Sequence, residues 1–412
     1  MRRTLPAALC IALGGCGGGN SDDPARSATP TRTAATPEAT ATPTPAALDP
    51  LDWRSTEHTG QPVRLERSGS GFLGVETRAV ASLTRSGSFR WRSKTASSDA
   101  FRGSVARGVP IAGGQGGAIK ALDPRTGRVR WSHPSTKYAF TDGRRVYAPA
   151  AGTITAYDPR SGAVRWSVPV PANVEQSQTG SGVLVVQTFP TGGAPRFLVL
   201  DPATGASRAA IDLPRGHYLT LVGRHLVDAG SGCNARLTGY GLDGAVVWRR
   251  ALKLGRTHDK RCDSYFASDV GGGVALNASA GRPLLLDPAT GRTRWKGPRR
   301  ASVDGTAGGH LVVGQPERQR TLGVDVRTGR TAWTYRGITA TWLTWRGYAA
   351  TNVMCEGTQC TVVLDGRTGR QLLKVPGVPE SFVPGPRAGL MTRIDSGRRY
   401  AARYGYVTLP GP

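Results

Sequence analysis

Cysteine and histidine side chains offer the most direct route to metal or disulfide chemistry in this sequence. Cys233, His258 and Cys262 could contribute to a zinc site, but such a site needs a further ligand in place, and no closely spaced cysteine pair supports one. The alternative is disulfide bonding, because an even number of cysteines outside the first 16 residues indicates disulfides in an exported chain. A Gly-containing turn would bring Cys355 and Cys360 together. We therefore predict the disulfides Cys355–Cys360 and Cys233–Cys262, and no bound metal.

The start of the chain carries a different cysteine chemistry. A basic segment, residues 1–4, precedes the apolar run of residues 5–13, which is long enough for a signal peptide and far too short to span a membrane. Leu13-Gly14-Gly15-Cys16 then resembles a bacterial lipobox, in which small residues admit the signal peptidase and the cysteine sulfur takes a diacylglycerol. Cys10 follows a leucine and is the poorer acceptor. We expect residues 1–15 to be a signal peptide and Cys16 to be lipidated; the alternative is that Cys16 is an ordinary thiol.

The histidines and carboxylates do not form a recognised catalytic motif. The sequence holds no G-x-S-x-G, H-E-x-x-H or P-loop pattern, and its carboxylates are too dispersed to nominate a glycosidase-like pair. His258, Asp259 and Asp263 form the densest polar cluster, which is either a recognition patch or an ordinary surface loop. We predict no catalytic residues, no cofactor and no enzymatic activity.

One phrase of eleven residues, Ala121–Trp131, recurs through most of the chain. In Asp-Pro-x-Thr-Gly the Asp side chain accepts hydrogen bonds from amides ahead of it, Pro presets φ, and Gly supplies the positive φ that closes a hairpin turn. The turn glycines recur about every 40 residues, and six of the nine tryptophans lie four residues after one of them. Looser copies surround Gly87 and Gly244. The repeat residues are Asp123, Gly127, Trp131, Asp158, Gly162, Trp166, Asp201, Gly205, Trp248, Asp287, Gly291, Trp295, Asp325, Gly329, Trp333, Asp365 and Gly369.

Strand alternation predicts which residues after a turn glycine face the core. After Gly127, Val129 and Trp131 share one face of the strand, and Arg128 and Arg130 share the other. We expect the apolar pair to face inward and the arginines to line an exposed outer edge, where charge discourages edge-to-edge association. The repeated aspartates would then serve the turns and not catalysis.

A period near 40 residues with strand-like content is typical of propeller blades rather than of helical repeats. Repeats that read x-L-D-x-x-T-G-x-x-x-W resemble those of the PQQ-like (quinoprotein-type) β-propellers. The resemblance covers roughly residues 60–410 and implies that the tryptophans pack between neighbouring blades. We therefore expect an all-β propeller of four-stranded antiparallel blades, eight by the number of repeat copies, with seven as the alternative.

The same resemblance bears on activity. In the quinoprotein dehydrogenases of this family an adjacent Cys-Cys disulfide, an Asp base and calcium ligands hold the cofactor. No adjacent cysteine pair exists here, so the chain is more similar to the non-enzymatic BamB-like branch. We expect a binding or scaffold module in the cell envelope. The alternative is a divergent quinoprotein-type oxidoreductase, or another enzyme with its site in the propeller channel.

The expected organisation has three parts. Residues 1–15 form the signal peptide, residues 16–50 form a lipidated, Thr/Pro/Ala-rich tether that cannot bury a core, and residues 51–412 form the propeller. Three further strands follow the last repeat copy, near 381–383, 389–394 and 399–407. We expect them to close the ring together with N-terminal strands, because a blade built from both termini leaves no open edge.

The charge balance is strongly basic, with a net charge of +26, and arginine dominates the basic residues. No nucleic-acid-binding motif or interleaved aromatic platform accompanies the arginines, so we expect no nucleic-acid partner. The predicted protein is a monomeric lipoprotein on the extracytoplasmic face of the cell membrane, attached through its lipid anchor only. Its expected partner is an unidentified envelope protein or wall polymer.

Overall fold

The computed structural model describes residues 54–407, except for short gaps at 57–61, 69–70, 77–78, 85–88, 95–103, 114–116, 136–138, 151, 172, 191–192, 231–235, 253–264, 279–281, 337–339, 346, 356–357, 377, 384–387 and 396–399. Several strands near both ends of this range are described by their backbone alone. In the described part of the chain, no helix is long and apolar enough to cross a membrane. The signal peptide, Cys16 and the tether that we predict lie outside the described residues.

Eight four-stranded antiparallel sheets follow one another along the chain, each built from four consecutive strands. Their strands are β2 (Pro62–Ser68), β3 (Gly71–Glu76), β4 (Ala79–Leu83) and β5 (Phe89–Lys94); β6 (Ser104–Ala106), β7 (Val109–Ala112), β8 (Ala118–Leu122) and β9 (Val129–Pro134); β10 (Phe140–Thr141), β11 (Val146–Ala150), β12 (Thr153–Tyr157) and β13 (Val164–Pro169); β14 (Asn173–Gly180), β15 (Val183–Phe189), β16 (Arg196–Leu200) and β17 (Ser207–Asp212); β18 (Tyr218–Val222), β19 (His225–Ala229), β20 (Arg236–Gly241) and β21 (Val246–Ala251); β22 (Tyr265–Asp269), β23 (Val274–Ala278), β24 (Leu284–Leu286) and β25 (Thr293–Lys296); β26 (Ser302–Ala307), β27 (His310–Gln315), β28 (Arg320–Asp325) and β29 (Thr331–Arg336); and β30 (Ala340–Trp345), β31 (Tyr348–Cys355), β32 (Thr358–Asp365) and β33 (Gln371–Pro376).

A ninth sheet combines the two ends of the described chain. It contains β34 (Val378–Val383), β35 (Ala388–Asp395) and β36 (Tyr400–Val407), and its outermost strand is β1 (Arg54–Thr56). In this pairing Arg54 lies opposite Tyr404 and Thr56 lies opposite Ala402. The expected closure by strands from both termini is confirmed, and it leaves the outer side of β36 paired.

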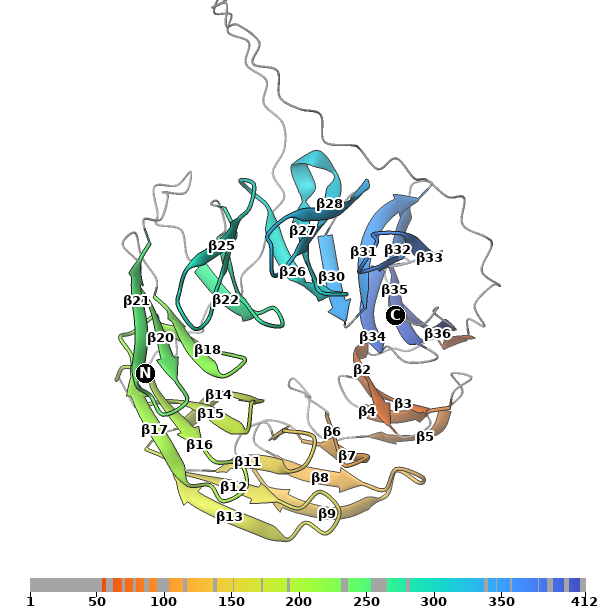
Figure 1. Cartoon of the computed structure of the whole chain (residues 1–412). Coiled ribbons are helices and arrows are strands. Elements are labelled where there is room, and N and C mark those ends of the chain that lie inside the picture. The colour runs from red at the N-terminus through yellow and green to blue at the C-terminus, as the bar shows by residue number, and fades with distance from the viewer. Residues whose placement is uncertain are drawn as a thin grey trace, which may run out of the picture. The chain divides into compact units, whose positions relative to one another are not determined.

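The sheets form a closed ring of nine blades. The first or second strand of each sheet contacts the first strand of the next sheet, and β34 of the ninth sheet contacts β2 of the first (Figure 1). The propeller fold and the four-stranded antiparallel blades are therefore confirmed, whereas the expected count of eight blades is wrong. The count fell one short because each repeat copy marks one blade, and the closing blade carries no copy of the turn phrase.

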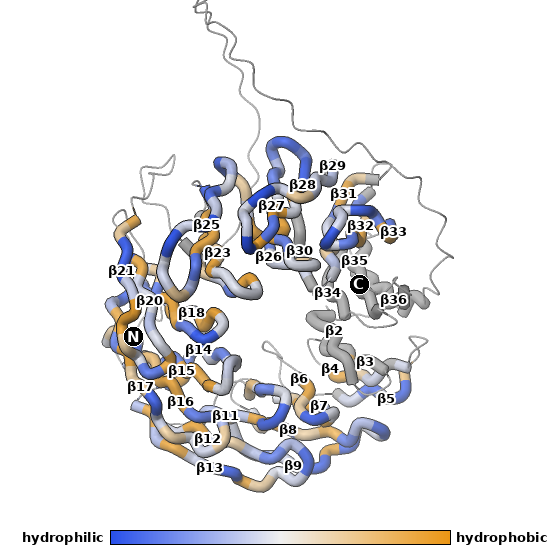
Figure 2. Tube along the Cα trace, in the orientation of Figure 1, coloured by the Kyte–Doolittle hydropathy of each residue, from blue (hydrophilic) through white to orange (hydrophobic). Residues whose placement is uncertain are grey.

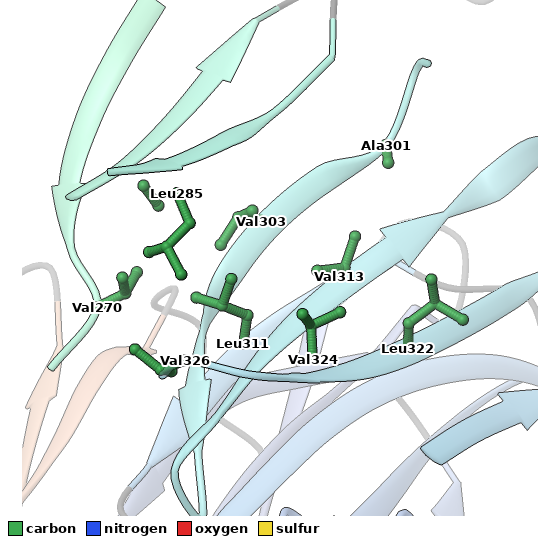
Figure 3. Close-up of a cluster of buried hydrophobic side chains, with 10 residues drawn as sticks. Val270, Leu285, Ala301, Val303, Leu311, Val313, Leu322, Val324 and Val326 are labelled. Carbon is green, nitrogen blue, oxygen red and sulfur yellow. The ribbon is translucent and has the colours of Figure 1, made fainter. Parts of the chain in front are cut away.

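In the described residues, the hydrophobic core lies between neighbouring sheets and is divided into separate clusters. In Figure 3, Val270 and Leu285 of the sixth sheet's segment pack against Val303, Leu311 and Val313 of the next sheet. Figure 2 shows hydrophobic stretches along inner strands such as β15, while hydrophilic residues gather at the connections. Each added blade brings its own buried interface, so a propeller can exceed the size of a single compact core.

Candidate functional site

The repeated turn is built as its chemistry predicts. In the first full copy, Asp123 Oδ1 accepts hydrogen bonds from the amides of Arg125 (2.9 Å) and Thr126 (3.0 Å), and the Gly127 amide donates to the Asp123 carbonyl (2.8 Å). Gly127 has φ +71°, in the left-handed region. The same pair of hydrogen bonds from backbone amides to the carboxylate recurs at Asp158, Asp201, Asp287, Asp325 and Asp365.

A β-bulge follows every turn, three residues after the glycine. In the first full copy Leu122 pairs with Val129 and Ala121 pairs with Trp131, so Arg130 is the extra residue. All eight copies show the same shift, at Arg90, Arg130, Arg165, Arg208, Val247, Arg294, Ala332 and Leu372. The bulge interrupts strict alternation, so residues two and four after the glycine no longer share one face.

One expectation about the strand faces is therefore wrong. Val129 is 51% exposed and Val164 is 58% exposed, although the alternation placed both toward the core. Arg128 and Arg130 are exposed, as expected, and the Arg130 guanidinium also binds Asp123 Oδ2 at 2.7 Å. Equivalent ion pairs join Arg165 to Asp158, Arg208 to Asp201 and Arg294 to Asp287.

These ion pairs set the protonation of the turn carboxylates. The Arg130 guanidinium, together with the backbone amide of Arg125, lowers the pKa of Asp123 to about 2. Arg165 likewise holds the pKa of Asp158 well below its usual range, and Arg208 lowers that of Asp201. These three turn carboxylates are thus ionised and engaged at neutral pH, as a structural role requires.

Each repeat tryptophan lies against the turn of the following blade. The indole Nε1 of Trp131 donates to the Pro159 carbonyl at 2.9 Å, and its ring covers Gly162, where an added Cβ would lie 2.7 Å from Trp131 Cγ. The same donation is made by Trp91 to Pro124, Trp166 to Pro202, Trp248 to Pro288 and Trp333 to Gly366. The expected packing between blades is confirmed, and each turn glycine so covered is required both for its φ and for its lack of a side chain.

The degenerate fourth copy shows what replaces a missing tryptophan. Gly205 is followed four residues later by Ala209, and the next turn glycine, Gly244, packs on that small side chain, with 2.9 Å from an added Cβ to the Ala209 Cβ. Ile211 also approaches Gly244, at 3.7 Å. The interface between these two blades therefore lacks the indole hydrogen bond found in its neighbours.

Other inter-blade contacts gave no recognisable signal in the sequence. The Gln178 side chain on β14 bonds both the Leu219 carbonyl and the Leu221 amide of β18, at 2.8 and 2.7 Å. Asn277 on β23 does the same with both backbone groups of Val303 on β26. These amides satisfy backbone groups of inner strands whose sheets end there. A single glutamine or asparagine in a strand carries no periodicity that would have revealed this use.

One histidine–carboxylate pair lies on the fifth blade. His217 Nδ1 lies 3.0 Å from Asp228, whose side chain is only 5% exposed, and burial raises the pKa of this carboxyl. Within the described residues, no group of three or more His, Cys, Asp or Glu side chains could hold a metal. His258, Asp259, Asp263, Cys233 and Cys262 lie outside those residues.

Neither of the two predicted disulfide pairings is tested by the described residues. Cys360 is buried in β32 and is disulfide-bonded. The side chain of Cys355, like Cys233 and Cys262, falls outside the description, so the two pairings remain predictions.

The nine four-stranded sheets, their bulged outer strands and the indole contacts between them define a β-propeller of the PQQ-like repeat type. A family model described as outer membrane protein assembly factor BamB matches residues 115–208 and 234–376, more than half of the chain. The chain therefore belongs to this family.

The chain is similar to several solved structures at low sequence identity. BamB from Moraxella catarrhalis is 16% identical with a TM-score of 0.48, and the match covers 87% of this chain and 100% of that one. Sqt1 of Saccharomyces cerevisiae is 13% identical with a TM-score of 0.52, covering 79% and 98%. A eukaryotic initiation factor is 9% identical with a TM-score of 0.54, covering 81% and 90%. Among curated proteins, none matches this chain.

Proposed function

We propose that this protein is a lipid-anchored, extracytoplasmic scaffold that binds another component of the cell envelope and takes part in envelope assembly. The family match over residues 115–208 and 234–376 carries this proposal, since the family is described by a role in assembling outer membrane proteins. The lipobox ending at Cys16 and the Thr/Pro-rich tether after it supply the means of anchoring.

The geometry favours a binding role over catalysis, because the repeat residues make contacts that stabilise the ring. The turn carboxylates of Asp123, Asp158, Asp201 and Asp287 are each engaged by a guanidinium and by backbone amides. The chemistry of the repeated phrase is thus structural, and recognition falls to the connections between strands, which differ from blade to blade. Rigid scaffolds with variable loops are a common arrangement for binding proteins.

The anchor is tested with Cys16→Ala in the full chain, with Cys10→Ala as the matched control. We expect the wild-type protein and Cys10→Ala to fractionate with membranes and to carry a lipid by intact mass. Cys16→Ala should lose both properties. Membrane association of Cys16→Ala without a change in mass would contradict the anchor.

The scaffold role is tested by crosslinking intact cells that express either the wild-type chain or Cys16→Ala, followed by purification and identification of the crosslinked species. We expect one envelope component to be enriched with the anchored protein, and the purified pair to associate at micromolar concentration or tighter. If the purified pair does not associate, or if no component is enriched, the scaffold assignment fails.

The absence of catalysis is part of the proposal and needs its own experiment. The purified chain, incubated with pyrroloquinoline quinone and Ca²⁺, should show neither a retained quinone absorption band after gel filtration nor dye-linked alcohol dehydrogenase activity. A retained band with turnover would favour the alternative of a divergent quinoprotein oxidoreductase.

A further inference from the structure

A hollow of about 420 Å³ lies between the connections of two neighbouring blades. Its lining includes Arg282 from the β23–β24 connection, Arg299 and Arg300 from the β25–β26 connection, and Glu317 and Arg318 from the short 3₁₀ helix η1 (Pro316–Arg318) between β27 and β28. Because successive strands are antiparallel, these three connections lie at one end of the blades. The Asp turns between β24 and β25 and between β28 and β29 lie at the opposite end.

The charges around this arginine hollow are unbalanced. Arg300 is paired with Glu317, at 2.5 Å. Within the described residues, Arg282, Arg299 and Arg318 have no carboxylate at ion-pair distance, in contrast to four of the bulge arginines, which bind their own turn aspartates. Four guanidinium groups thus face one carboxylate, and the hollow attracts an anion.

A buried side chain and two left-handed backbone positions fix the connections that line the hollow. Gln315 lines it with a side chain that is only 4% exposed, and its Oε1 accepts a hydrogen bond from Arg320 Nε. Arg300, which lines the hollow, and Gln319, which follows Arg318 in the chain, have φ values of +54° and +47°. This conformation is unfavourable for residues other than glycine, so the two connections are held in a costly shape.

We propose that the arginine hollow binds a phosphate group, carried either by a soluble phosphorylated compound or by the headgroup of a phospholipid. A guanidinium presents planar N–H donors that match phosphate oxygens in pairs, and a phosphate monoester carries close to two negative charges with three acceptor oxygens. Donors from three separate connections can approach such a tetrahedral group from different directions, whereas a planar carboxylate accepts one or two forks. The volume also exceeds that of a bare ion and leaves room for the attached organic group.

This site is independent of the lipid anchor and of the scaffold role. The anchor depends on Cys16, whereas the hollow belongs to the sixth and seventh blades. Its failure or success can therefore be read separately from theirs.

Isothermal titration calorimetry of the full chain with glycerol 3-phosphate is the direct test. We expect saturable binding, and the double variant Arg282→Gln/Arg318→Gln should weaken it by about tenfold or more. The matched control is Arg128→Gln/Arg330→Gln, which removes the same charge from two exposed arginines beside Asp turns at the other end of the blades. The control should bind as tightly as wild type, and both variants should melt at the wild-type temperature.

Several outcomes would overturn the proposal. Wild-type protein that does not bind glycerol 3-phosphate at millimolar concentration lacks the site. Equal losses in the pocket and control variants would show attraction to the overall positive charge. Succinate binding as tightly as the phosphate ester would show that the hollow does not select phosphate.

Vesicles distinguish the two sources of the phosphate group. If a phospholipid headgroup is the ligand, vesicles of phosphatidylglycerol will compete with glycerol 3-phosphate for the wild-type chain, and phosphatidylcholine vesicles will compete less. If the ligand is a soluble phosphorylated compound, neither vesicle will compete. Both results support the phosphate site, provided that the pocket variant abolishes whichever binding is seen.

Discussion

Trp131 lies over Gly162 of the following blade and donates its indole N–H to the main-chain carbonyl of Pro159. One side chain therefore joins two blades by packing and by a hydrogen bond at once. Because equivalent contacts recur around much of the ring, the stability of the propeller depends on a series of similar joints between neighbours.

The tryptophan joint should be costly to remove. Trp166 is 8% exposed, and we expect Trp166→Ala to lower the free energy of unfolding by about 3–5 kcal/mol. Trp131 is partly exposed, so Trp131→Ala should cost less. Chemical denaturation monitored by circular dichroism measures both. Trp166→Phe keeps most of the packing without the N–H and should cost less than the alanine variant. Unchanged stability of Trp166→Ala would show that the indole does not hold the blades together.

The turn glycine beneath the indole should resist substitution for two separable reasons. Gly162 has φ +74°, and an alanine there would also place its Cβ against Trp131. Gly152 has φ +69° but no heavy atom within 4 Å of an added Cβ. We expect Gly152→Ala to cost about 1 kcal/mol from the backbone alone. Gly162→Ala should cost an additional 1–3 kcal/mol, roughly, from overpacking. Thermal or chemical unfolding measures both losses. Equal losses of stability in Gly152→Ala and Gly162→Ala would argue against the close contact between Gly162 and Trp131.

The ion pair within the turn predicts a stability that depends on pH. The pKa of Asp123 is about 2 in the folded protein, below its value in the unfolded chain. A carboxyl with a depressed folded pKa contributes stability that is fully present above its unfolded pKa and is lost as pH falls through the folded pKa. We therefore expect the stability difference between wild type and Asp123→Asn to be constant at neutral pH and to shrink between about pH 4 and about pH 2.

Urea unfolding at a series of pH values measures this difference. Asp325 provides the comparison, because the bulge residue of its copy is Ala332 and its carboxylate is held mainly by the Thr328 amide. Arg130→Gln should raise the pKa of Asp123, so that the contribution of Asp123 to stability is lost at a higher pH. The contribution of Asp325 should not change. A difference between wild type and Asp123→Asn that did not change with acidity would contradict the role of the ion pair.

The strand that closes the ring should control the oligomeric state. β1 pairs with β36 over Arg54–Thr56. Deletion of residues 51–57 leaves the outer side of β36 without its strand, and an exposed edge promotes association between chains. We expect the deletion to form dimers or larger species in light scattering and to melt earlier. Deletion of tether residues 20–46 is the control and should leave both properties unchanged.

The sequence specified the repeating unit because turn chemistry is local. Asp123, Pro124 and Gly127 act within a few residues of one another, so their roles could be derived from side-chain type and spacing alone. Strand–turn–strand copies about 40 residues apart then predicted propeller blades, and the structure confirms them. The position of Trp131 between blades followed from the same repeat.

Only the tertiary structure decided the features that depend on register and on ring closure. The bulge at Arg130 shifts the pairing by one residue, which exposes Val129 and returns the guanidinium to Asp123, and strict alternation could not predict this shift. The ninth blade joins β1 to β36 across nearly the whole length of the chain, and no repeat marks it. Arg282, Arg299 and Arg318 appear in the sequence as three of many arginines. They meet at one hollow because connections from two adjacent blades end on the same side of the ring.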